Sequence, residues 1–186
     1  MPAEIQIKGL CFSSSLDALR GIRGAEAQRA LEARASPDLR DTLTGLVRGD
    51  WYPVARYREL HALAQEVTGE GRELARQIGY LGTLADFNSV YGALAFALAP
   101  RTVIAMAPRV FGAYYRPADM YVVEARAGYT HTRWANCHGF DANVWQDVLG
   151  GCVAIVEVSG GAAVELELVA GGRDGDAHAE ALFHWH

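Results

Sequence analysis

The stretch that decides the fold is residues 120–137, MYVVEARAGYTHTRWANC, which divides into two β-rich segments at Gly128. Valine, tyrosine, threonine and tryptophan are enriched in strands, and a glycine between two such runs is typical of a hairpin turn. We therefore predict strands over residues 120–127 and 129–137. An antiparallel sheet accordingly begins in the C-terminal part of the chain.

A helix and a second hairpin follow this stretch. Asp141 suits the N-cap of a helix whose apolar residues recur at helical spacing up to Gly160. Residues 164–168 alternate apolar side chains with glutamates, which predicts a half-buried strand, and residues 177–185 predict a last strand with alternating faces.

Helical periodicity dominates the chain before residue 117. Residues 25–35 predict a helix, Ser36 before Pro37 predicts the start of another, and Pro53 suits the first turn of a third. Whether Asp86 caps a new helix or lies inside a long one stays open, and Ile5 and Ile7 suit a short strand or an extended arm.

The fold class that follows is α+β, in the order helices-β-β-α-β-β. We expect a single domain over residues 1–186, with a helical half at about 10–116. It packs on an antiparallel sheet of about four strands at about 117–186.

Composition excludes several classes of protein. The 186 residues are 51% hydrophobic with a formal net charge of −5, which argues against nucleic acid as a partner. Lys8 is the only lysine among the 17 basic residues, which leaves little room for Schiff-base chemistry or a phosphate-loop lysine.

Cysteine usage and hydropathy predict the compartment. Cys11, Cys137 and Cys152 are three widely spaced cysteines, which favours reduced thiols over a disulfide framework. The N-terminal residues do not form a secretion signal, and the most apolar stretch, residues 91–100, is half of the ~20 residues that a membrane span requires. We expect a cytoplasmic protein without a transmembrane segment.

Candidate metal and catalytic groups have simpler explanations. His178, Glu180 and His184 share one strand face and are weak candidates for zinc ligands, but a solvated sheet face explains them. Cys137 and His138 are adjacent and so point to opposite faces of a strand, which works against a thiolate–imidazole pair. The sequence predicts no catalytic residue and no cofactor, and a cysteine-dependent enzyme is a remote alternative.

A surplus of aromatic residues beyond ordinary core packing is the remaining signal. If some line a cavity between helices and sheet, a hydrophobic small molecule is the natural occupant; if they lie exposed on the helical half, they form a dimer interface. The paired glycines 150 and 151 indicate close approach by another backbone or a ligand. The candidate pocket residues are Phe87, Tyr91, Phe111, Tyr114, Trp134, Trp145 and Cys152.

Two resemblances accompany this interpretation. Residues 51–58 (WYPVARYR), 78–79 (IG), 99–100 (AP) and 114–116 (YYR) resemble a myxobacterial paralogous family of uncharacterised proteins. The C-terminal half, with Gly150-Gly151, residues 164–169, Gly175-Asp176 and Trp185, is similar to a broader superfamily. That superfamily unites four-vinyl-reductase ligand-sensing domains, small subunits of the TRAPP tethering complex and haem nitric-oxide-binding domains.

The superfamily resemblance implies helices packed on an antiparallel sheet, an apolar cavity under the helices in many members, and frequent homodimers. Zinc-binding relatives have a cysteine where this chain has Ala179. Haem-binding relatives need an axial histidine in the segment 102–115, which contains none here.

The function expected from these observations is a non-enzymatic sensor that binds a hydrophobic small molecule or lipid and works as a homodimer. The alternative is a homodimeric scaffold without a ligand, whose helical half docks onto itself or onto a signalling partner.

Overall fold

The computed structural model describes residues 4–95 and 100–186, and over these residues the predicted α+β class and element order are confirmed. The helices are α1 (Gly9–Arg34), α2 (Pro37–Thr44), α3 (Val54–Thr68), α4 (Glu73–Ala95), α5 (Pro100–Tyr114) and α6 (Ala142–Val158). The strands are β1 (Gln6–Lys8), β2 (Trp51–Pro53), β3 (Tyr115–Arg116), β4 (Asp119–Arg126), β5 (Tyr129–Ala135), β6 (Glu165–Gly171) and β7 (Ala179–His184).

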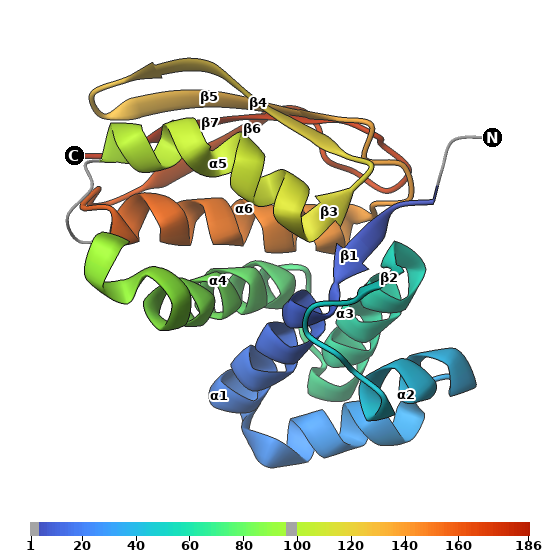
Figure 1. The fold of residues 1–186 in the computed structure, drawn as a ribbon. Helices are drawn as coiled ribbons and strands as arrows, with labels where there is room; N and C mark the ends of the chain where they lie inside the picture. The colour runs from blue at the N-terminus through green and yellow to red at the C-terminus, as the bar shows by residue number, and fades with distance from the viewer. Residues whose placement is uncertain (1–3, 96–99) are drawn as a thin grey trace.

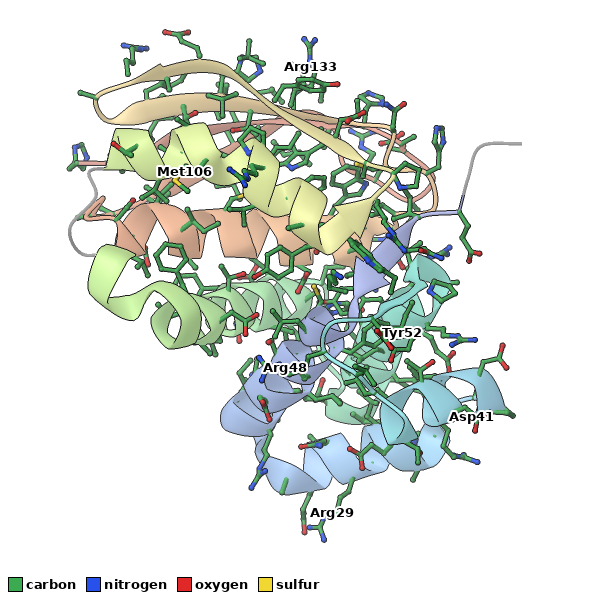
Figure 2. The ribbon with its side chains drawn as sticks, viewed as in Figure 1. Arg29, Asp41, Arg48, Tyr52, Met106 and Arg133 are labelled. Carbon is green, nitrogen blue, oxygen red and sulfur yellow. The ribbon has the colours of Figure 1, made fainter. Side chains whose placement is uncertain are left out.

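The larger sheet has the strand order β4-β5-β7-β6 and is antiparallel throughout, as the two predicted hairpins require. Its inner face carries buried side chains such as Trp134 and Phe183, and its outer face carries polar ones such as Arg133 (Figure 2). Helices α5 and α6 lie against the inner face, and α4 lies on the far side of α6 (Figure 1). The sheet therefore covers one side of a layer of helices.

A second, three-stranded sheet of order β2-β1-β3 was not predicted, although a short strand at Ile5 and Ile7 was one of the two alternatives left open. Residues 51–53 form β2 rather than the first turn of a helix, so α3 begins one residue after Pro53. Ile7 pairs with Tyr52 on one side and Tyr115 on the other. Strands of two or three residues are too short to show alternation, and pairing between residues this far apart along the chain gives no local signal.

Helix α1 extends further than the sequence indicated. The predicted helix at 25–35 is its second half, after a non-helical Gly24 with φ of 82°. The missed first half contains consecutive serines, which favour caps and turns over helix interiors. Burial of Phe12, Leu16 and Leu19 at helical spacing stabilises it there. Helix α4 runs without a break through Asp86, which settles that open alternative.

The paired glycines 150 and 151 serve contact between two backbones. A Cβ atom on Gly150 would overlap the backbone of Arg76, and one on Gly79 would overlap the backbone of Asp147. On Gly151 it would lie 2.6 Å from Oγ1 of Thr83. Helices α4 and α6 thus cross at a distance that only glycine permits, and α4 is the close neighbour that the sequence left unnamed.

The core is closed where the N-terminal part of α6 meets the sheet. The rings of Trp134 and Trp145 have centroids 6.4 Å apart, and those of Phe140 and Trp145 4.9 Å apart, all edge to face. We call Trp134, Phe140 and Trp145 the aromatic core; each is at most 2% exposed. None of the helices within the described ranges is both long enough and apolar enough to cross a membrane.

Candidate ligand-binding site

A partly open cavity of about 130 Å³ lies between α1, α4, α5, α6 and the inner face of the sheet. Helix α5 contributes one apolar wall and the sheet contributes the side chain of Phe183. Ala107 on α5 lines the space with a small side chain, whereas Gly82 and Gly151 line it where α4 meets Ser14 of α1 and where α6 meets Thr83 of α4. A cavity of this size compares with the engineered ~150 Å³ cavities that stay dry and bind benzene.

One end of this cavity is polar and is built on a single turn of α1. Residues spaced three and four apart share a helix face, so Cys11, Ser14 and Ser15 all face the cavity. Ser14 Oγ donates a hydrogen bond to Asp86 Oδ1 of α4 at 2.8 Å. We call the set Cys11, Ser14, Ser15, Asp86 and Asp147 the acidic end.

Asp147 of α6 is the most deeply buried carboxyl group of the acidic end, 6% exposed. Tyr57 donates its hydroxyl to Asp147 Oδ2 at 3.1 Å, and the hydroxyls of Tyr57 and Ser15 lie 2.7 Å apart. Burial raises the pKa of Asp147 to about 7, against the lowering effect of hydrogen bonds from Tyr57 and Tyr115. This carboxyl group therefore titrates near neutral pH.

His61 lies behind Asp147, on α3, and is fully buried. Its Nε2 is 3.5 Å from Asp147 Oδ1, and neither ring nitrogen has a hydrogen-bond partner. Burial lowers the pKa of His61 to about 3, so the ring is neutral at pH 7. The pair Asp147–His61 is an uncommon polar feature in an otherwise apolar interior.

The cysteine thiols are protonated. Cys11 and Cys152 line the cavity, whereas Cys137 does not. Burial raises the pKa of Cys152 to about 12, and burial followed by the charge of Asp119 raises that of Cys137 to about 12. A nucleophilic cysteine needs a lowered pKa, so these environments oppose the cysteine-enzyme alternative.

The predicted pocket residues fall into three groups. Phe87, Phe111, Tyr114 and Cys152 line the cavity. Trp134 and Trp145 instead belong to the aromatic core and are fully buried. The side chain of Tyr91 lies outside the described residues.

The sequence interpretation missed the polar half of the site. Asp147 gives a signal that could have been used: it is a lone carboxylate within the apolar run of a helix that the hydropathy pattern already buries. Tyr57 and Ser15 gave none, because their partners lie 90 and 42 residues away along the chain.

The C-terminal histidines do not form a metal cluster. Glu180 accepts hydrogen bonds from His131 at 3.0 Å and from Arg133 at 2.8 Å. Over the part of the chain that the structure describes, no three His, Cys, Asp or Glu residues are grouped as metal ligands would be. His178 and His184 remain residues of the outer sheet surface and its flanking loop.

Comparisons with known proteins bear on the fold. No family profile and no curated protein matches the sequence, so membership of the myxobacterial family is unsupported. Among solved structures, the chain is similar to an Fe(II) unliganded H-NOX protein mutant from K. algicida, with a TM-score of 0.72 and 15% identity over 97% of both chains. It is also similar to an oxygen-binding H-NOX domain related to soluble guanylate cyclases, with a TM-score of 0.69 and 13% identity over 96% of this chain and 95% of that one. This chain therefore has an H-NOX-like fold.

Proposed function

We propose that this domain is a sensor that binds a small, largely apolar molecule in the cavity beneath the sheet. The observation that carries the proposal is the cavity itself, which is walled by apolar side chains and has a single acidic end. Ligand pockets in proteins are typically apolar with a few convergent polar groups. The H-NOX-like fold supports a sensor role, because one structure of this fold is an oxygen-binding H-NOX domain in its oxygen complex.

The size of the cavity limits the ligand. Drug-sized molecules occupy pockets of roughly 300–1,000 Å³, whereas this one encloses about 130 Å³. A single ring or a short branched chain fits that volume, and a lipid with a full acyl chain does not. We therefore favour the small-molecule half of the sequence-based expectation.

Haem does not fit this site. The neighbours of this fold include a protein described by its haem redox potential, but the described residues that line this cavity include no histidine. The lining cysteines and Tyr57 and Tyr115 have pKa values raised by burial, which keeps their thiols and hydroxyls neutral rather than anionic ligands. The volume of about 130 Å³ is also below the roughly 300 Å³ at which pockets for drug-sized molecules begin.

A thermal-shift experiment tests the proposal with toluene as the probe. Toluene at ten times its dissociation constant should stabilise the protein by about 1.4 kcal/mol, which raises the Tm of a domain of this size by roughly 3–5 °C. Ala107→Phe should fill the cavity and abolish this shift. Met106→Phe is the matched control, because Met106 is the preceding residue of α5 and is 46% exposed (Figure 2).

If toluene shifts the Tm of wild type and of Ala107→Phe equally, or shifts neither, the proposed function is wrong. If toluene shifts the Tm of wild type alone, native mass spectrometry of the freshly purified protein identifies any molecule that co-purifies in the cavity.

The dimeric scaffold stays a prediction. Of the seven large apolar residues that are exposed within the described chain, four lie on the edge strands β4 and β6, namely Tyr121, Val123, Leu168 and Val169. The other three, Val47, Leu81 and Met106, lie in the helical half, so this distribution favours neither face as a dimer interface. Analytical ultracentrifugation measures the oligomeric state directly.

A further inference from the structure

We propose that the ligand of this cavity is a small apolar amine, whose protonated nitrogen binds at the acidic end between Asp147 and Asp86. The inference rests on the proposed function and assigns it a chemical class. It follows from the charge, the placement and the surroundings of the two carboxylates.

Charge is the first argument. Two carboxyl groups line the cavity, and none of its described lining residues is arginine, lysine or histidine. Arg48 reaches Asp86 at 3.4 Å through a side chain that is 61% exposed, so it neutralises that carboxylate from the outer side. The only ion-pair partner of Asp147 among the described residues is His61, which is neutral at pH 7. A buried carboxylate without a cation is costly, and a cationic ligand supplies the missing charge.

Placement is the second argument. Ser14 is bound to Asp86 directly, and the adjacent Ser15 is linked to Asp147 through the hydroxyl of Tyr57. The charges of both carboxylates, after burial, raise the pKa of the Cys11 thiol one turn earlier on α1. The two carboxyl groups therefore converge on the same turn of α1, where one ammonium group can approach both.

The surroundings of the acidic end are the third argument. Phe111 and Tyr115 line the cavity and stack with ring centroids 4.7 Å apart, and Tyr115 is hydrogen-bonded to Asp147. Aromatic faces attract cations and also accept the apolar body of the ligand. An alkyl or aryl amine satisfies both the acidic end and the apolar walls, whereas a neutral hydrocarbon leaves Asp147 without a cation.

Binding of such an amine should depend on pH through Asp147. Below about pH 7 this carboxyl group is protonated and loses its attraction for an ammonium ion, while a simple amine keeps its charge. Among the residues that the structure describes, no arginine or lysine lines the cavity or pairs with Asp147. The titratable groups that face Asp147 are Cys11 from α1, Tyr57 and His61 from α3, Asp86 from α4, Tyr115 from β3 and Cys152 from α6.

The experiment compares benzylamine, benzyl alcohol and toluene, which share one ring, by titration calorimetry with the full chain at pH 8 and pH 5.5. We expect benzylamine to bind at least tenfold more tightly than benzyl alcohol at pH 8, and this preference to fall to less than threefold at pH 5.5. Asp147→Asn should lose the preference at pH 8 and keep toluene binding. Glu167→Gln, at an exposed carboxylate on β6, is the control that should change nothing.

Equal affinities for benzylamine and benzyl alcohol at pH 8 would overturn the amine inference and leave the proposed function standing. Failure of all three probes to bind would overturn the proposed function itself. The wild-type comparison at two pH values decides the matter even if Asp147→Asn does not fold.

Discussion

Two regions along the same helix, α6, differ sharply in how they are packed. Near its start, Trp145 packs edge to face against Trp134 and Phe140 in the aromatic core, and the three side chains are at most 2% exposed. On the face that carries Val148 and Cys152, the same helix borders a cavity of about 130 Å³.

The difference teaches that aromatic bulk alone does not distinguish a closed region from a hollow one. Trp134 and Trp145 lie in the closed region, yet Phe87, Phe111 and Phe183 line the cavity. The glycines of α4 and α6 do not mark the empty space either, because a Cβ atom on Gly82 or Gly151 would meet Ser14 or Thr83. A search for pockets in a sequence therefore needs the positions of the helices as well as the residue types on their buried faces.

The largest loss of stability is expected when a side chain of the aromatic core is removed. Trp145→Ala should lower the free energy of unfolding by about 4 kcal/mol, because the vacated space is surrounded by fully packed side chains. Phe111→Ala should cost about half as much, since this side chain already borders empty space. Urea denaturation of both variants measures the ratio, and equal losses would contradict the distinction between the two regions.

Helices α4 and α6 cross in close backbone contact, and this contact contributes to stability. Gly79→Ala should cost about 3 kcal/mol, because the new Cβ atom overlaps the backbone of Asp147. Gly112→Ala on α5 is the control: no atom lies within 4 Å of its added Cβ, and alanine favours a helix, so stability should rise by about 0.5–1 kcal/mol. A neutral Gly79→Ala in the same urea assay would mean that the helices cross less closely.

Asp147 and His61 make the stability of the cavity region depend on pH. The folded pKa of Asp147 is raised to about 7, so on its own this group makes the protein less stable as pH rises from about 4 to 7. The folded pKa of His61 is lowered to about 3, so on its own it makes the protein less stable as pH falls from about 6.5 to 3. Between about pH 4 and 6.5 the two dependences cancel.

His61→Leu should expose the dependence due to Asp147. Between pH 7 and pH 5 the variant should gain about 2 kcal/mol of unfolding free energy relative to the change seen in wild type. Urea unfolding of both proteins at the two pH values measures this gain. Parallel pH profiles would show that His61 is not held neutral in the folded protein.

The smallest expected effect comes from adding volume. Ala107→Leu should change stability by less than about 1 kcal/mol, because the cavity receives the new methyl groups. Ala154→Leu, at a position that is 1% exposed and does not line the cavity, should cost about 2 kcal/mol. Comparison of their urea midpoints tests where the empty space lies, and the reverse order would place it elsewhere.

Much of the fold was readable from local patterns. The hairpin over residues 120–137, the Asp141 N-cap and the alternating last strand were all confirmed, because each depends on neighbouring residues alone. The small sheet of β1, β2 and β3 was missed, since its register joins Ile7 to Tyr52 and Tyr115, far along the chain.

The candidate site was readable only in part, for the same reason. Cys152 and Phe111 could be named from helical stripes, and the structure places both in the cavity wall. The acidic end depends on a tertiary arrangement: residues 11–15, 57, 86 and 147 converge from four helices. No spacing rule within one element predicts such a convergence.

A crystal structure of the purified protein under xenon pressure tests most directly whether the cavity can bind a ligand, since apolar cavities of this size bind xenon. We expect xenon in the space bordered by Phe111, Val148 and Cys152, and none within the aromatic core. Xenon absent from that space, with the side chains of α5 closed onto α6, would contradict the claim that this fold encloses a ligand site.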